Sequence, residues 1–192
     1  MNPYLKTPPA IEPVTLEELK DHLRVDSVDE DALLTGLLAA AREWCEGFQN
    51  RAYITQTLQL WLDEWPGGSA IVLPRPPLQS VASVKYYGID DTEYTLDAAD
   101  YRVSLYGYKG RVVLNYGKSW PSTTLRPAEA VVVEYDAGYG DDATDVPERA
   151  RMAIKIVAAH LYENREVTDV REHKEVPLGV QALLGLERIW PL

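Results

Sequence analysis

Two stretches near the C-terminus decide the fold: VPERARMAIKIVAAHLYENRE, residues 146–166, and VPLGVQALLGLERI, residues 176–189. In the first stretch, apolar residues recur at spacings of three and four, which is typical of an amphipathic helix. Asp145 is expected to cap this helix, and Pro147 is tolerated in its first turn. The predicted buried stripe consists of Ala150, Ala153, Ile154, Val157 and Leu161.

The second stretch predicts another helix after Pro177, following the charged link 171–175. A helix this short is marginal by itself in water, so its apolar face must pack on something. Two alternatives are open: it packs on its own helical domain, or it packs on another protein subunit. In the second case, deleting residues 177–192 would leave a folded protein that fails to assemble. The candidate interaction residues are then Leu178, Val180, Leu183, Leu184, Ile189 and Trp190.

The N-terminal region predicts a helical hairpin. Residues 1–13 contain four prolines and are expected to form an extended lead-in. Thr15 and Glu18 have the spacing of a capping box, which predicts a helix as far as about Leu23. Ser27 and Glu30 repeat that spacing and predict the start of a second, longer helix. Its core-facing stripe is Leu34, Leu37, Leu38, Ala41, Trp44, Cys45 and Phe48, and Gly47 and Asn50 favour its termination.

From about residue 52 the apolar period changes to two, which indicates β-strands. Strands are expected at 54–62, 70–73, 81–87, 101–105, 111–115 and 129–135, separated by Gly- and Pro-containing breaks. Such strands suggest an antiparallel sheet or a small barrel. The predicted fold class is therefore α+β: a discontinuous helical domain carrying an inserted antiparallel β-rich region. The predicted division is 1–52 and 143–192 for the helical parts and 53–142 for the insertion.

Composition excludes several classes of protein. No apolar run approaches the roughly 20 residues that span a membrane, and the N-terminus lacks the pattern of a signal peptide. The single cysteine, Cys45, lies on an apolar helical stripe and is predicted to be buried rather than reactive. The net charge of −11 opposes sequence-independent DNA binding, which depends on Lys and Arg. Five Trp and twelve Tyr fit either a half-buried sheet or a protein interface.

Candidate catalytic and ligand sites fail on inspection. The segment 117–119, Gly-Lys-Ser, imitates the end of a phosphate-binding loop, but Val112 replaces the required glycine. His160 and Glu163 lie one helical turn apart, yet two ligands do not make a metal site. We therefore predict that the protein is not an enzyme and that it has no catalytic, metal-binding or cofactor-binding residues and no cofactor.

Segments at both ends of the chain, in their order and spacing, resemble the tailed-phage head–tail connector (neck adaptor) family. At the N-terminal end these are TLEELK at 15–20 and HLRVD at 22–26, followed by an acidic run at 29–31 and a long helix ending near Gly47. At the C-terminal end, Val146-Pro147 opens a helix that leads to HLYENRE at 160–166 and VPLGV at 176–180. The resemblance covers about half of the chain.

The resemblance implies a structural virion protein without a cofactor: a ring of about twelve subunits under the portal that links the DNA-filled head to the tail. The expected partners are other copies of the chain, the portal protein and a tail-side neck or completion protein, with no membrane. DNA would pass through the lumen without specific binding. The expected location is the virion neck, and the host cytoplasm during assembly. The alternative is an acidic, non-enzymatic assembly or DNA-packaging accessory protein that binds other proteins without forming a neck ring.

Overall fold

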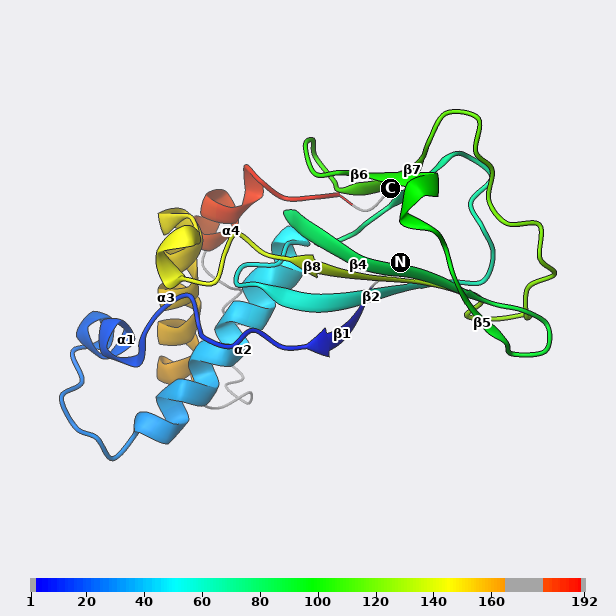
Figure 1. Cartoon of the computed structure of the whole chain (residues 1–192). Helices are drawn as coiled ribbons and strands as arrows, with labels where there is room; N and C mark the ends of the chain where they lie inside the picture. The colour runs from blue at the N-terminus through cyan, green and yellow to red at the C-terminus, as the bar shows by residue number, and fades with distance from the viewer. Residues whose placement is uncertain (1–2, 165–177, 191–192) are drawn as a thin grey trace. The chain divides into compact units, whose positions relative to one another are not determined.

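The computed structural model describes residues 3–164 and 178–190 and confirms the α+β class (Figure 1). The described chain forms two units. The β unit contains residues 3–9 and 55–139, and the helical unit contains residues 10–54, 140–164 and 178–190. Residues 3–9 thus join the β-rich region, whereas the sequence pattern placed them with the helices. None of the described helices is both long and apolar enough to cross a membrane.

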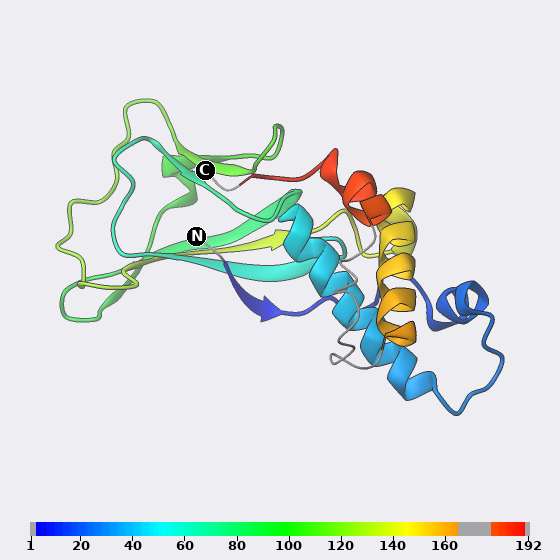
Figure 2. The same cartoon turned by 180° about the vertical axis from the view of Figure 1, so that it is seen from behind.

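Four α-helices build the helical unit: α1 (Leu16–Leu23), α2 (Asp31–Gln49), α3 (Glu148–Glu163) and α4 (Leu178–Gly185). The two views show α3 lying against α2 (Figures 1 and 2), and α3 also packs on α1 and α4. The apolar stripe of α3 is buried as predicted, except that Leu161 is half-buried. Its apolar residues, together with those of α2, therefore form the core of this unit.

The helix ends agree with the sequence in part. The capping box of Thr15 and Glu18 is present at α1, and Asn50 ends α2 in the left-handed conformation, with φ of 58°. The second predicted capping box is wrong: Ser27 Oγ accepts the Asp29 N–H at 3.1 Å, and α2 begins only at Asp31. Ser27 instead closes a local turn, because a short hydroxyl side chain satisfies the nearest free N–H.

The predicted cap of α3 is also wrong. Asp145 lies in a short 3₁₀ helix, η2 (Ala143–Asp145), and its carboxylate accepts the backbone N–H of Asp142 at 3.1 Å. Pro147 occupies the N-cap position of α3. The carboxylate of Asp145 therefore organises the turn before α3 rather than the helix end itself.

The β unit contains eight strands in two antiparallel sheets. The larger sheet has the order β1-β2-β8-β4-β5 and the smaller one β3-β7-β6, so the described residues form no closed barrel. A 3₁₀ helix, η1 (Ala98–Asp100), precedes β6. The strands are β1 (Tyr4–Thr7), β2 (Gln56–Leu62), β3 (Ala70–Val72), β4 (Leu78–Tyr87), β5 (Glu93–Thr95), β6 (Tyr101–Ser104), β7 (Arg111–Leu114) and β8 (Val131–Ala137).

Strand β8 is the central strand of the larger sheet, and one of its faces is apolar and buried. Val131, Val133 and Tyr135 are completely buried, and β8 pairs with both β2 and β4. The smaller sheet packs close to β4 at Gly110, where a Cβ atom would lie 2.4 Å from the Leu78 side chain. Glycine is therefore required for this close approach.

Strands β1 and β5 lie at the two edges of the larger sheet and were not predicted from the sequence. β1 is flanked by Pro3 and Pro8, and prolines are tolerated beside an edge strand. Its Lys6 ammonium forms an ion pair of 2.7 Å with Glu134 of β8. Because all four residues of β1 are exposed, no buried face marked this strand in the sequence.

Candidate assembly surfaces

The C-terminal arm, residues 178–190, packs on the helical unit of its own subunit. α4 ends at Gly185, so the helix is shorter than the apolar pattern indicated. The side chains of Val180, Leu184 and Ile189 are at most 1% exposed. The sequence left two alternatives open for the arm. In the structure of the single subunit the arm packs on its own helical domain, which is the first of them.

Polar groups at the end of α2 hold the arm in place. The Gln49 side-chain amide donates to the Leu184 carbonyl at 2.9 Å, and the Ile189 N–H donates to the Gln49 carbonyl at 2.9 Å. Arg51 donates through Nε to the Glu187 carbonyl at 2.8 Å. Gln49 is only 1% exposed, so these hydrogen bonds are shielded from water and specify where the arm lies.

The six predicted interaction residues divide by exposure. Leu183 is half-buried, and the side chain of Leu178 lies outside the described residues. Trp190 is 64% exposed, and Leu186, which is not one of the six predicted residues, is 83% exposed. The Arg188 guanidinium lies 4.4 Å from the ring centres of both Phe48 and Trp190, so it holds the Trp190 ring beside α2.

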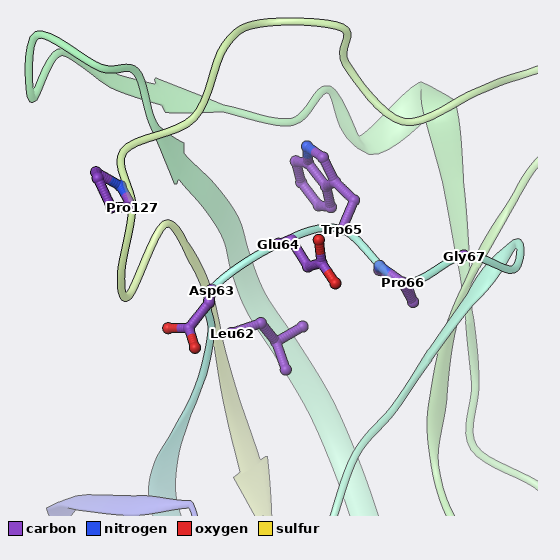
Figure 3. A pocket seen from close by; sticks show the side chains of 7 residues that line it. All are labelled: Leu62, Asp63, Glu64, Trp65, Pro66, Gly67 and Pro127. Atoms are coloured by element: carbon purple, nitrogen blue, oxygen red, sulfur yellow. The ribbon is translucent and has the colours of Figure 1, made fainter.

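The loop after β2 forms a second candidate surface, in the β unit. An open pocket of about 410 Å³ lies beside Trp65 (Figure 3). Its apolar lining comes from Leu62, Trp65, Pro66, Gly67 and Pro127, and two carboxylates, those of Asp63 and Glu64, complete it. Asp63 accepts the Glu129 N–H at 2.9 Å, which ties the loop to the segment before β8.

A ladder of aromatic rings supports this pocket. Trp65 stacks on Trp120 with ring centres 4.8 Å apart, and it packs in a T-shaped arrangement with Tyr86, with ring centres 5.5 Å apart. Tyr86 in turn stacks on Tyr94 at 5.2 Å. Within the described residues, Trp65 Nε1 is a buried donor without a hydrogen-bond partner. Part of the tryptophan and tyrosine enrichment therefore belongs to the sheet, as one of the two sequence interpretations proposed.

The turn between β6 and β7 forms the third candidate surface, which we name the hairpin tip (residues 105–109). Leu105, Tyr106 and Tyr108 are 43%, 91% and 59% exposed, and Lys109 follows them. Exposed apolar side chains gathered on one protruding turn are typical of a contact with another protein. The sequence signal was the run Leu-Tyr-Gly-Tyr-Lys, in which the strand pattern placed Leu105 in a strand and took Gly107 as part of a break.

The geometry gives no support to catalysis in the described residues. Burial raises the pKa of the Cys45 thiol to about 12, and the nearby Glu46 carboxylate adds to this, so the thiolate nucleophile is disfavoured. Lys118 of the imitation phosphate loop forms an ion pair with Asp100. Across residues 3–164 and 178–190, no three His, Cys, Asp or Glu side chains gather as a metal site would require.

Comparison with known proteins identifies the family. The family model described as "Head completion protein" matches residues 12–172, more than half of the chain. The chain belongs to the head completion protein family. Its function is that of a structural head–tail connector in a phage-type particle. No sequence among the curated proteins matches the chain.

Solved structures agree with this assignment. The chain is 26% identical to a chain in the neck of an empty gene transfer agent (GTA) particle computed with C6 symmetry, with a TM-score of 0.83. It is 25% identical to a chain in the neck of the native GTA particle computed with C12 symmetry, and to one in the native virion, each with a TM-score of 0.81. Each match covers 100% of this chain and 97% of the other. The structural match thus extends over the C-terminal arm, which lies beyond the family model.

Proposed function

We propose that this protein forms a ring of about twelve subunits in the virion neck, between the portal and the tail. The observation that carries the proposal is the full-length structural match to chains from GTA necks computed with C6 and C12 symmetry. Because the two folds match along the whole chain, this protein has the same helices and strands available for contacts with neighbouring subunits as those neck chains have. The proposed partners are the portal on the head side and a tail-side neck or completion protein, and the role is non-enzymatic.

The exposed part of the C-terminal arm is the proposed docking element for a neighbouring subunit or the portal. Val180, Leu184 and Ile189 position the arm by packing inside the subunit, which leaves Leu186 and Trp190 as its exposed apolar anchors. Large apolar side chains of this kind often dominate the energy of a protein contact, at about 2 kcal/mol or more each.

The net charge suits a channel through which DNA slides. Residues 10–54, 140–190 and 192 contain 20 acidic and 11 basic residues, so this part carries −9 of the −11 charge. Acidic groups facing a lumen repel DNA phosphates within a Debye length of about 8–10 Å. We propose that acidic side chains of this part line the lumen. We also propose that the ring assembles from subunits made in the host cytoplasm.

A mass measurement on the purified protein, alone and with purified portal, tests the proposal. We expect a complex with about twelve copies per portal ring, visible as an added ring by electron microscopy. A monomer in the absence of portal is compatible with the proposal, because a portal can act as the template. A portal that binds no ring, together with absence of the protein from finished particles, would favour the accessory-protein alternative.

A further inference from the structure

We propose that the hairpin tip of one subunit inserts into the Trp65 pocket of the next subunit around the ring. The inference rests on the proposed ring and names a contact that would close it. The occupant of the pocket is thus a second copy of this chain, and the contact joins two different surfaces of the same β unit.

The tip and the pocket have complementary chemistry. The tip presents Leu105 and the ring of Tyr106, which is 91% exposed, and the pocket is lined by Trp65 and two prolines. The pocket volume of about 410 Å³ lies within the range of about 300–1,000 Å³ typical of sites that bury a ligand. An aromatic ring against tryptophan and proline would remove apolar surface from water on both subunits.

The charges match as well. Among the residues that the structure describes, neither Lys109 at the base of the tip nor Glu64 in the pocket has an ion-pair partner within its own subunit. Figure 3 shows Glu64 beside Trp65 and Pro66 on the loop that forms the pocket. An ion pair between Lys109 and Glu64 of adjacent copies would offset part of the repulsion between subunits that each carry −11.

The placement of the two surfaces favours a ring. Figures 1 and 2 both show the β6–β7 turn at one end of the β unit and the loop after β2 at the other. A contact between different patches on opposite ends is head-to-tail, and head-to-tail contacts form closed rings when the rotation between copies closes. The same separation prevents the tip from filling the pocket of its own subunit.

A charge exchange tests the contact in the full-length protein with portal. Lys109→Glu and Glu64→Lys should each raise the concentration needed for half-maximal ring assembly at least about tenfold, since each places like charges together. The double variant K109E/E64K should return it to within about threefold of wild type. Tyr106→Ser should weaken assembly similarly, whereas Tyr116→Ser, at a side chain equally open to solvent but outside the tip, should not.

Cysteine cross-linking provides a second readout. A Tyr106→Cys/Glu64→Cys variant, oxidised on the portal, should give a ladder of linked chains up to the full ring, and each single variant should give dimers at most. Cys45 is buried and does not interfere. Rings that form normally with both charge-reversed single variants, and without a ladder, overturn the contact but leave the ring intact. Absence of any ring with wild-type protein overturns the proposed function and this contact with it.

Discussion

Glu18 connects three parts of the helical unit through one carboxylate. It accepts the Thr15 N–H at 2.9 Å to close the capping box, and it forms an ion pair with Arg151 of α3. Arg151 also donates to the Pro13 carbonyl at 2.9 Å. The backbone hydrogen bond from Thr15 and the contact with Arg151 lower the pKa of Glu18 below its ordinary value of 4.5. The charged form of Glu18 therefore stabilises the folded state.

Glu18→Gln should reduce the free energy of unfolding by roughly 0.5–1 kcal/mol at neutral pH, because the amide keeps the cap but loses the ion pair. The folded-state pKa is lowered, so this stabilisation is present above pH 4.5 and is lost as the pH falls through the folded-state value. Urea titrations at several pH values measure the difference. Glu17→Gln, at an exposed acid in the same turn, is the control and should change little. A difference that grows at acid pH would contradict the assignment.

Arg42 is a buried cation that depends on two acids. It is 6% exposed and pairs with Glu12 at 2.8 Å and with Glu46 at 2.9 Å. Glu46 is 4% exposed and also accepts the Tyr53 N–H at 2.8 Å. Removing the cation would therefore take an ion pair away from a buried carboxylate.

Arg42→Met should lower the free energy of unfolding by about 3–5 kcal/mol, because the buried Glu46 carboxylate loses its ion pair with Arg42. Equilibrium urea unfolding measures this cost. Glu43→Gln is the matched control, since Glu43 contacts the same arginine at 3.5 Å but its side chain is 70% exposed. A loss below about 0.5 kcal/mol in Arg42→Met would show that the buried pair is dispensable.

At the scale of the element, the C-terminal arm contains a matched pair of leucines. Leu184 is completely buried against the helical unit, and Leu186, two residues later, is 83% exposed. The same substitution at the two positions therefore separates the structural role of the arm from its proposed docking role. Deleting residues 177–192 does not separate them, because it would also remove the buried side chains. We thus expect that deletion to destabilise the helical unit, in contrast to the expectation from the sequence.

Leu184→Ala should lower the free energy of unfolding by about 2–5 kcal/mol, since it leaves a cavity between the arm and its helices. Leu186→Ala should change it by less than about 0.5 kcal/mol but reduce attachment to portal-bearing heads, as should Trp190→Ala. Chemical unfolding and a head-binding assay give the two readouts. If Leu186→Ala and Trp190→Ala proteins assemble as well as wild type, the arm serves only to complete the subunit.

For the whole molecule, the acidic charge has a consequence for DNA. Twelve copies at −11 each bring together about −132 charges, so contacts between subunits must offset strong repulsion. The two units share this charge unequally, because residues 1–9, 55–139 and 191 contain 10 acidic and 8 basic residues. The part that contains the helices is consequently the more repulsive toward phosphate.

The isolated protein should show no measurable binding to duplex DNA at physiological salt, because its net charge of −11 opposes the phosphate neutralisation by Lys and Arg that drives such binding. Fluorescence anisotropy with a labelled duplex at two salt concentrations measures this. Binding that is tight at low salt and falls steeply as salt rises would contradict a non-adhesive channel. A basic DNA-binding protein, measured in parallel, shows that the assay detects such binding.

The sequence by itself determined the local elements. The spacing of Thr15 and Glu18 specified where α1 begins, and the periods of 3.6 and two separated helices from most strands, because these signals depend on neighbours only a few residues apart. It also determined the acidic charge and the position of the arm in the chain.

Only the tertiary structure decided which surfaces meet. β1 carries no buried face, so its place at the sheet edge follows from pairing with β2, which lies about fifty residues away. The hairpin tip and the Trp65 pocket become surfaces only when distant strands assemble around them. An apolar period reveals which face of the arm must be covered, but the covering groups, Gln49 and the end of α2, are supplied by another part of the chain. Burial of a side chain depends on the segment that carries it and on the segment that covers it, and a local sequence pattern describes only the first of these.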